Sequence, residues 1–352
     1  MLPRGHFGAR SVEVAVRTPL TKSCNNVRFM ETTTELPDRA LAFSTVFGSL
    51  RYNVASVVRG KDAIVDLAVL ALLTRSHLLI EDIPGVGKTT LAKAVAMSIS
   101  GTFGRIQFTP DLLPSDVVGT SIWNQHTASF EFRAGPVFSN VLLADEINRA
   151  SPKTQSALLE AMAEQHATVD GQTRALPRPF MVIATQNPNE HHGTYPLPES
   201  QLDRFAMRVS LGYPQRDDER DVLEMNGSQR RCEQLAPVAT LDEIDAMAEQ
   251  IDSTYIDDAV RSYLMDLVDA TRTHPSIDLG MSPRSALSLQ RLARARACAS
   301  GRTFVIPDDV KALLPFVAAH RISIASSARL QGETAEHLIT EIASTVPVPT
   351  AG

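Results

Sequence analysis

The chain of 352 residues carries 34 Lys and Arg against 40 Asp and Glu, a net charge of -6, and 43% of its residues are hydrophobic. This acidic balance argues against a protein that binds nucleic acid or anionic membranes by general electrostatic attraction, because that mode needs a basic face. The length suits two domains better than one small core.

The three cysteines, Cys24, Cys232 and Cys298, are far apart and show no C-x-x-C spacing. Neither a disulfide framework nor a zinc site is predicted. No stretch approaches the roughly 18 apolar residues of a membrane span. We therefore expect a cytoplasmic protein.

The first 29 residues are rich in Arg, Ser and Thr, with Glu13 as their only acid, and show no helical period. We predict a disordered extension over residues 1–35. A transit peptide would have this composition. The alternative that we favour is that Met30 is the natural start and that the preceding residues are not translated.

Residues 36–73 show a helical pattern, and an apolar strand is predicted over residues 76–80. In nucleotide-binding α/β domains, the segment just before the phosphate loop commonly covers the adenine. Val57, Val58 and Gly60 are therefore candidate adenine contacts. Plain core packing explains the two valines equally well.

The stretch IEDIPGVGKTTLAKA, residues 80–94, runs from this strand through a glycine-bearing loop into a helix. Its pattern predicts a phosphate-binding loop for ATP: backbone N–H groups and Lys88 contact the phosphates, and the Thr89 hydroxyl ligates Mg²⁺. Asp82 stands where the full pattern has glycine, so the match is incomplete. The predicted nucleotide-binding residues are Pro84, Gly85, Val86, Gly87, Lys88, Thr89, Thr90 and Gly60.

Two β-hairpins are predicted as insertions into the nucleotide-binding domain. Residues 120–123 and 130–133 form the first, where Trp123 serves either a partner or the packing of the hairpin itself. The second covers residues 167–174 and turns at Asp170-Gly171, a sequence typical of a type I′ turn. Its Arg174 could contact a polymer in a ring pore, although a solvated hairpin tip is the simpler interpretation.

An apolar strand at residues 141–144 ends in Asp145 and Glu146. Two adjacent acids at a buried strand end are costly unless a cation answers them. We expect Asp145 to hold Mg²⁺ and Glu146 to orient the attacking water. Asn187, at the end of the next apolar strand, could share that water.

Arg204 follows Asp203 at a predicted corner between helix and strand, and the residues alone leave two interpretations open. It either forms an ion pair with Asp203 or a neighbour, or it reaches the ATP of an adjacent subunit.

Helical patterns replace strands after residue 214, at residues 241–251, 257–272 and 282–299, with two further helices between residues 307 and 344. Ser282 and Pro283 predict a capped helix start. Arg284 lies in its first turn, where a cation opposes the helix dipole, which suggests that an anion answers it. We divide the chain into an α/β core (36–214), a helical lid (215–345) and an extended tail (346–352).

Several motifs together resemble the MoxR group of AAA+ ATPases over nearly the whole chain from residue 36. These motifs are IPGVGKTT, LLADEINRASPKTQSALLEAM, ATQNP, PLPESQLDRF and GMSPRS, in this order. The resemblance implies an AAA+ P-loop core, a parallel sheet flanked by helices with inserted hairpins, followed by an all-α lid. It implies Lys88 and Thr89 as Walker A, Asp145 and Glu146 as Walker B, Asn187 as sensor 1, Arg204 as arginine finger and Arg284 as sensor 2.

The resemblance also implies Mg²⁺-dependent ATP hydrolysis in a ring, hexameric in related proteins, that acts as a chaperone for separate client proteins. Such rings are thought to insert metals or cofactors, often with a von Willebrand factor A domain partner. The alternative is a nucleic-acid motor or a transcription activator with the same core. The acidic balance, the lack of an appended DNA-binding module and the lack of a GAFTGA-like loop argue against it. A scaffold that binds ATP with little turnover is disfavoured because Glu146 is present.

Overall fold

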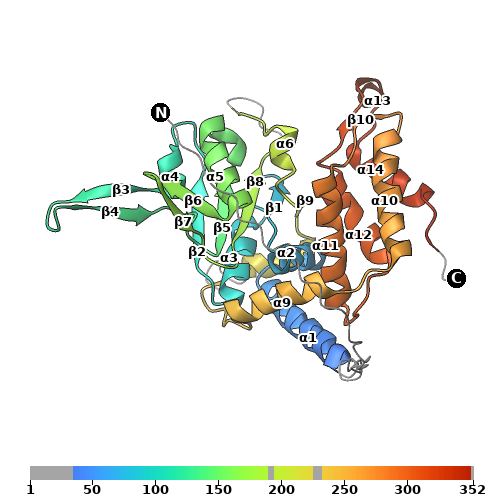
Figure 1. The fold of residues 1–352 in the computed structure, drawn as a ribbon, viewed down its shortest axis with the longest axis horizontal. Helices are drawn as coiled ribbons and strands as arrows, with labels where there is room; N and C mark the ends of the chain where they lie inside the picture. The colour runs from blue at the N-terminus through green and yellow to red at the C-terminus, as the bar shows by residue number, and fades with distance from the viewer. Residues whose placement is uncertain (1–34, 189–193, 225–231, 350–352) are drawn as a thin grey trace, which may run out of the picture.

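A computed structural model describes residues 35–188, 194–224 and 232–349 (Figure 1). The expectations for the N-terminal extension, the transit peptide and the Met30 start fall on residues 1–34 and so lie outside the described residues.

The centre of the structure is a parallel sheet of five strands in the order β2-β5-β8-β1-β9. Every residue of β5 and β8 is buried except the last of each strand, as expected for a parallel sheet covered on both faces. The strands are β1 (Leu78–Glu81), β2 (Phe103–Gln107), β5 (Val141–Asp145), β8 (Met181–Gln186) and β9 (Met207–Val209).

Alternate residues of the strands face two separate apolar clusters. Leu78 and Ile80 pack with α1 (Glu35–Ala55), α2 (Asp62–Leu73) and α3 (Lys88–Ser98). Leu79 faces the opposite side, against α5 (Pro152–Glu164). Ser151 caps α5 as predicted, accepting a hydrogen bond from the Thr154 N–H.

Both predicted hairpins are present. The first consists of β3 (Gly119–Asn124) and β4 (Ser129–Ala134), follows the short helix α4 (Pro114–Val118) and projects away from the body (Figure 1). The second consists of β6 (His166–Val169) and β7 (Gln172–Ala175). Asp170 and Gly171 have φ values of 52° and 76°, as a type I′ turn requires.

Aromatic contacts answer the two questions about these hairpins. Trp123 packs edge-on against Phe130, yet the two residues stay 50% and 71% exposed, so Trp123 both packs and remains accessible. The guanidinium of Arg174 lies 4.0 Å from the centroid of the Phe132 ring on the other hairpin. Arg174 is therefore half-buried between the hairpins rather than at a solvated tip.

The chain after β9 is mainly helical, and one apolar cluster continues from the sheet through α1 into α11 and α12. The expectation that strands stop at residue 214 was wrong, because β10 (Ile277–Leu279) and β11 (Ser323–Ile324) pair antiparallel. The short helix α6 (Glu199–Leu202) precedes β9, and the helices after β9 are α7 (Arg216–Glu224), α9 (Leu241–Ser253), α10 (Asp258–Thr273), α11 (Pro283–Ala299), α12 (Pro307–Ala318), α13 (Ser326–Leu330) and α14 (Ala335–Thr345). The exact domain limits stay a prediction.

In the described part of the chain, no helix combines the length and the apolar character that crossing a membrane requires.

His77, a buried residue just before β1, connects this strand to β8 and α5. Its Nδ1 accepts a hydrogen bond from the Val182 N–H at 3.0 Å, and its Nε2 donates to the Met162 carbonyl at 3.2 Å. These partners fix the neutral tautomer, since a proton on Nδ1 would face the Val182 N–H. Burial lowers the pKa of His77 to about 4.

We expect the free energy of unfolding to fall as the pH drops below about 6.5. His77 is then protonated in the unfolded chain, whereas the buried imidazole of the folded chain stays neutral. Between pH 7 and pH 5, His77 alone lowers the free energy of unfolding by about 2 kcal/mol. Urea denaturation at both pH values should show a smaller loss in His77→Gln, whose amide offers a donor and an acceptor and does not titrate. The exposed His337→Gln variant is the control and should behave as the wild type. Equal losses in all three proteins would contradict the prediction.

Candidate active site

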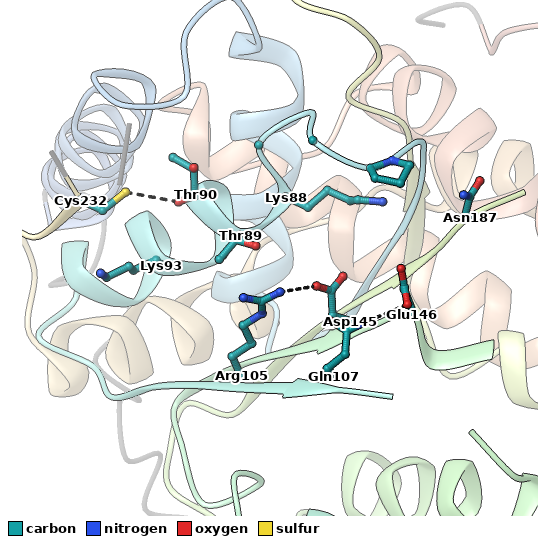
Figure 2. A pocket seen from close by; sticks show the side chains of 13 residues that line it. Lys88, Thr89, Thr90, Lys93, Arg105, Gln107, Asp145, Glu146, Asn187 and Cys232 are labelled. Carbon is teal, nitrogen blue, oxygen red and sulfur yellow. Dashed lines mark hydrogen bonds and ion pairs between the residues drawn. The ribbon is translucent and has the colours of Figure 1, made fainter. Parts of the chain in front are cut away.

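A cavity of about 500 Å³ opens at the carboxyl ends of the central strands (Figure 2). It brings together most of the residues predicted for ATP chemistry. Its lining includes Pro84, Gly85, Gly87, Lys88, Thr89, Thr90, Asp145, Glu146 and Asn187, together with Lys93, Arg105, Gln107 and Cys232.

The phosphate loop connects β1 to α3 in the conformation that its glycines permit. Gly85 and Gly87 have φ values of 87° and 98°, in the region that only glycine adopts readily. Gly87 directly precedes α3, so the N-terminal end of that helix, where the helix dipole favours an anion, borders the cavity. Lys88 extends across the loop, with Nζ 2.7 Å from the Asp82 carbonyl (Figure 2).

Asp82, which occupies the position of the first loop glycine, points away from the cavity and is buried. Its carboxylate accepts hydrogen bonds from the Ile83 N–H, the Ser210 hydroxyl and the Gly212 N–H at 2.8, 3.0 and 2.6 Å. Asp82, the residue that departs from the pattern, therefore anchors the loop to the segment after β9. Nothing in the sequence near Asp82 indicated this role.

Asp145 and Glu146 are positioned by Thr185, a fully buried residue of β8. The Thr185 hydroxyl donates to Asp145 at 2.6 Å and accepts from the Glu146 N–H at 2.9 Å. Glu146 itself has a φ of 56°, a left-handed conformation that non-glycine residues adopt at a cost of order 1 kcal/mol. One hydroxyl thus holds the Asp145 carboxylate and the Glu146 backbone, and Thr185 was not singled out from the sequence.

The two acids are contacted by three side chains that the sequence did not indicate. Arg105 forms an ion pair with Asp145 at 2.9 Å, and the Gln107 amide donates to Glu146 at 2.7 Å (Figure 2). The Arg149 Nε forms an ion pair with the Glu146 Oε2 at 3.2 Å.

The donors in the cavity fit Mg²⁺, a cation that prefers oxygen ligands and uses few from the protein. The Thr89 hydroxyl and the Asp145 carboxylate both line the cavity. Among the residues that the structure describes, no three His, Cys, Asp or Glu side chains are grouped to hold a metal. A metal here would therefore depend on substrate phosphates for further ligands.

A second cavity of about 300 Å³ adjoins the phosphate loop and suits an adenine base. Val57 and Val58 line it and are also buried in the apolar cluster, so their core packing is confirmed and their contact with adenine stays a prediction. Val86 lines it too. Gly60 instead packs against α7, where a Cβ would lie 1.9 Å from Asp218, and its contact with adenine stays a prediction. Further lining residues are Arg59, Lys61, Pro84, Gly85, Gly87, Thr90, Tyr213, Pro214 and Glu219.

Arg204 and Arg284 are not among the residues that line either cavity. The Arg204 guanidinium donates to the Leu159 carbonyl of α5 at 2.8 Å. Arg284 is exposed in the first turn of α11, whose cap, Ser282, accepts a hydrogen bond from the Ser285 N–H as predicted.

The comparison with known proteins agrees with this site. Residues 77–207 match the ATPase family associated with various cellular activities (AAA), and residues 269–342 match the AAA lid domain. The chain is 48% identical to the uncharacterized protein YeaC of Bacillus subtilis, over 86% of this chain and 95% of that protein. It is 39% identical to the chaperone MoxR1 of Mycobacterium tuberculosis, over 85% of this chain and 81% of that protein. The chain belongs to the MoxR family of AAA+ ATPases.

A solved structure supports the assignment of an ATPase fold. The crystal structure of a putative ATPase from Cytophaga hutchinsonii superposes with a TM-score of 0.82 at 35% identity, covering 90% of this chain and 98% of that one. The predicted family, the α/β fold class with a helical lid and the ATPase activity are confirmed. The roles of the individual site residues stay predictions.

We expect Thr185→Val to lower the kcat of this MoxR ATPase about tenfold, because valine keeps the volume but removes the hydroxyl that positions Asp145 and Glu146. Steady-state ATP hydrolysis measures the effect. Thr185→Ser keeps the hydroxyl and should stay near the wild-type rate. A Thr185→Val protein that folds and turns over as fast as the wild type would contradict the prediction.

Proposed function

We propose that this chain is the subunit of a homo-oligomeric ring, a hexamer, in which ATP hydrolysis drives the remodelling of partner proteins. The observation that carries the proposal is the separation of the catalytic groups: Lys88 and Glu146 line the cavity, whereas Arg204 lies outside it. An arginine finger contributes on the order of 10³ to 10⁵ in rate to related phosphoryl transfers. The arrangement makes sense if Arg204 completes the site of a neighbouring subunit.

Within one site, the phosphate loop and Lys88 bind the β- and γ-phosphates of ATP, and Val57 and Val58 cover the base. Glu146 orients the attacking water, with Asn187 as a second contact to it. Thr89 and Asp145 would hold Mg²⁺, which neutralises phosphate charge when bound. Because phosphoryl transfer needs positioning and charge neutralisation more than covalent chemistry, these groups suffice once an arginine approaches the γ-phosphate.

The chaperone role is supported by the name of the M. tuberculosis relative and by an accessible apolar surface. Ile122, Trp123 and Phe130 on the β3–β4 hairpin are 46%, 50% and 71% exposed. Exposed aromatic residues on a projecting hairpin suit contact with another protein. The family resemblance carries the proposal further. The client is a separate protein, the partner is a von Willebrand factor A domain protein, and the task is the insertion of a metal or cofactor.

We place this activity in the cytoplasm, where unpaired thiols persist; the described cysteines, Cys232 and Cys298, are free and buried. The alternative of a nucleic-acid motor is not supported by any contact described above, since Arg174 packs on Phe132.

We expect ATP hydrolysis per subunit to rise with protein concentration and to be nearly abolished in Glu146→Gln and in Arg204→Ala. Mixing the two variants in equal amounts should restore part of the activity, because Arg204→Ala subunits then receive a finger from Glu146→Gln neighbours. Turnover measured across a concentration series, with the assembly mass from light scattering, checks both statements. Activity that is independent of concentration and of Arg204 would rule out the shared site.

A further inference from the structure

The loop that carries Arg204 is bound to the lid through the side chain of Asp203. The two carboxylate oxygens of Asp203 accept hydrogen bonds from the hydroxyls of Ser282 and Ser285, each at 3.1 Å. Both serines belong to the start of α11. The Arg321 Nε lies 3.0 Å from the same carboxylate.

Arg321 also binds the backbone on both sides of Arg204. Its Nη2 donates to the carbonyls of Asp203 and Phe205, at 3.1 and 2.9 Å. The neighbouring His320 Nε2 lies 2.9 Å from the Phe205 carbonyl. The main chain at Arg204 therefore has little freedom to move without the segment after α12.

In the ion pair between Asp203 and Arg321, the Arg321 side chain is buried, with 2% exposed, and the Asp203 side chain is half-buried, with 19% exposed. Burial lowers the pKa of Arg321 to about 10, so the guanidinium stays charged at neutral pH. A buried charge that loses its partner is strongly destabilising, so the Arg321 guanidinium, which also donates to two backbone carbonyls, is held beside Asp203. The contact thus works as a rigid link rather than as a sliding surface.

At its other end, this link reaches the N-terminus of α11, the helix that carries Arg284. Ser282 caps α11 by accepting from the Ser285 N–H at 3.1 Å, and Arg284 lies between the two serines. The Asp203 carboxylate therefore joins the loop of Arg204 and the first turn of α11 into one unit.

We propose that Asp203 is a positioning residue that sets the position of Arg204 toward the neighbouring subunit's ATP and makes it follow the lid helix α11. This inference rests on the interfacial site proposed above. Asp203 touches no nucleotide in this scheme. It acts through Arg204, so its effect falls on the catalytic step of the next subunit and not on ATP binding to its own.

The test compares Asp203→Asn with Arg204→Ala, each alone and mixed with Glu146→Gln. We expect Asp203→Asn to lower kcat about tenfold with KM for ATP nearly unchanged, because the finger contributes in the transition state. Mixing with Glu146→Gln subunits, which keep an intact Asp203, should restore activity as it does for Arg204→Ala. Asp258→Asn, a change at an exposed carboxylate of α10, is the control and should match the wild type.

The outcomes separate this proposal from the one on which it rests. Wild-type kcat in Asp203→Asn, or a loss that mixing does not restore while Arg204→Ala is restored, would overturn the role of Asp203 alone. An Arg204→Ala variant with wild-type activity would remove the interfacial site, and the positioning role with it.

Ser285→Ala serves as a second variant in case Asp203→Asn does not fold with Arg321 left unpaired. It removes one hydroxyl from the Asp203 carboxylate and leaves the ion pair and the Ser282 cap in place. We expect kcat to fall about threefold with recovery on mixing with Glu146→Gln, since one hydrogen bond of the link is lost. A folded Ser285→Ala protein with wild-type kcat would overturn the proposal.

Discussion

The active site depends first on the parallel pairing of β1, β5 and β8, because parallel strands end at one edge of the sheet. The register places Ile80 beside Thr185 and Ala144 beside Ala184, so the phosphate loop and Asp145 leave the sheet at the same level. Each of these strands is buried and nearly apolar, which makes the edge a rigid platform. The catalytic groups thereby gain the preorganisation that electrostatic catalysis requires.

Two adjacent acids at that edge are the costly feature of the site, and the surrounding residues compensate for them. Arg105, Gln107 and Arg149 contact the carboxylates, and Thr185 holds the strained backbone of Glu146 through its N–H. Backbone strain of this kind persists only where the neighbouring contacts over-determine the geometry. The same contacts hold Glu146 where the proposed mechanism needs it to orient a water, so in that mechanism the cost in stability is tied to the chemistry.

Features with local causes could be predicted from the sequence, and features with distant partners could not. The helix caps at Ser151 and Ser282 and the turn at Asp170-Gly171 depend on neighbouring residues, and the structure confirms them. Asp82 resembled a defect in the phosphate loop because its partner Ser210 lies 128 residues away in the chain. Thr185 was indistinguishable from an ordinary β-branched strand residue. The strands β10 and β11, of three and two residues, are too short to show a period.

Charged contacts, in addition to the apolar cluster, connect the lid to the sheet. Besides the link at Asp203, Arg208 of β9 pairs with Glu336 of α14 and, at 2.9 Å, with Glu81 at the end of β1. Glu81 accepts a further hydrogen bond at 2.7 Å from Gln186, the residue before Asn187. Apolar surfaces can slide with little loss of contact, whereas hydrogen bonds and ion pairs persist only over a narrow range of distances and angles. A lid that moves must therefore break them or displace the strand ends that carry Asn187 and the phosphate loop.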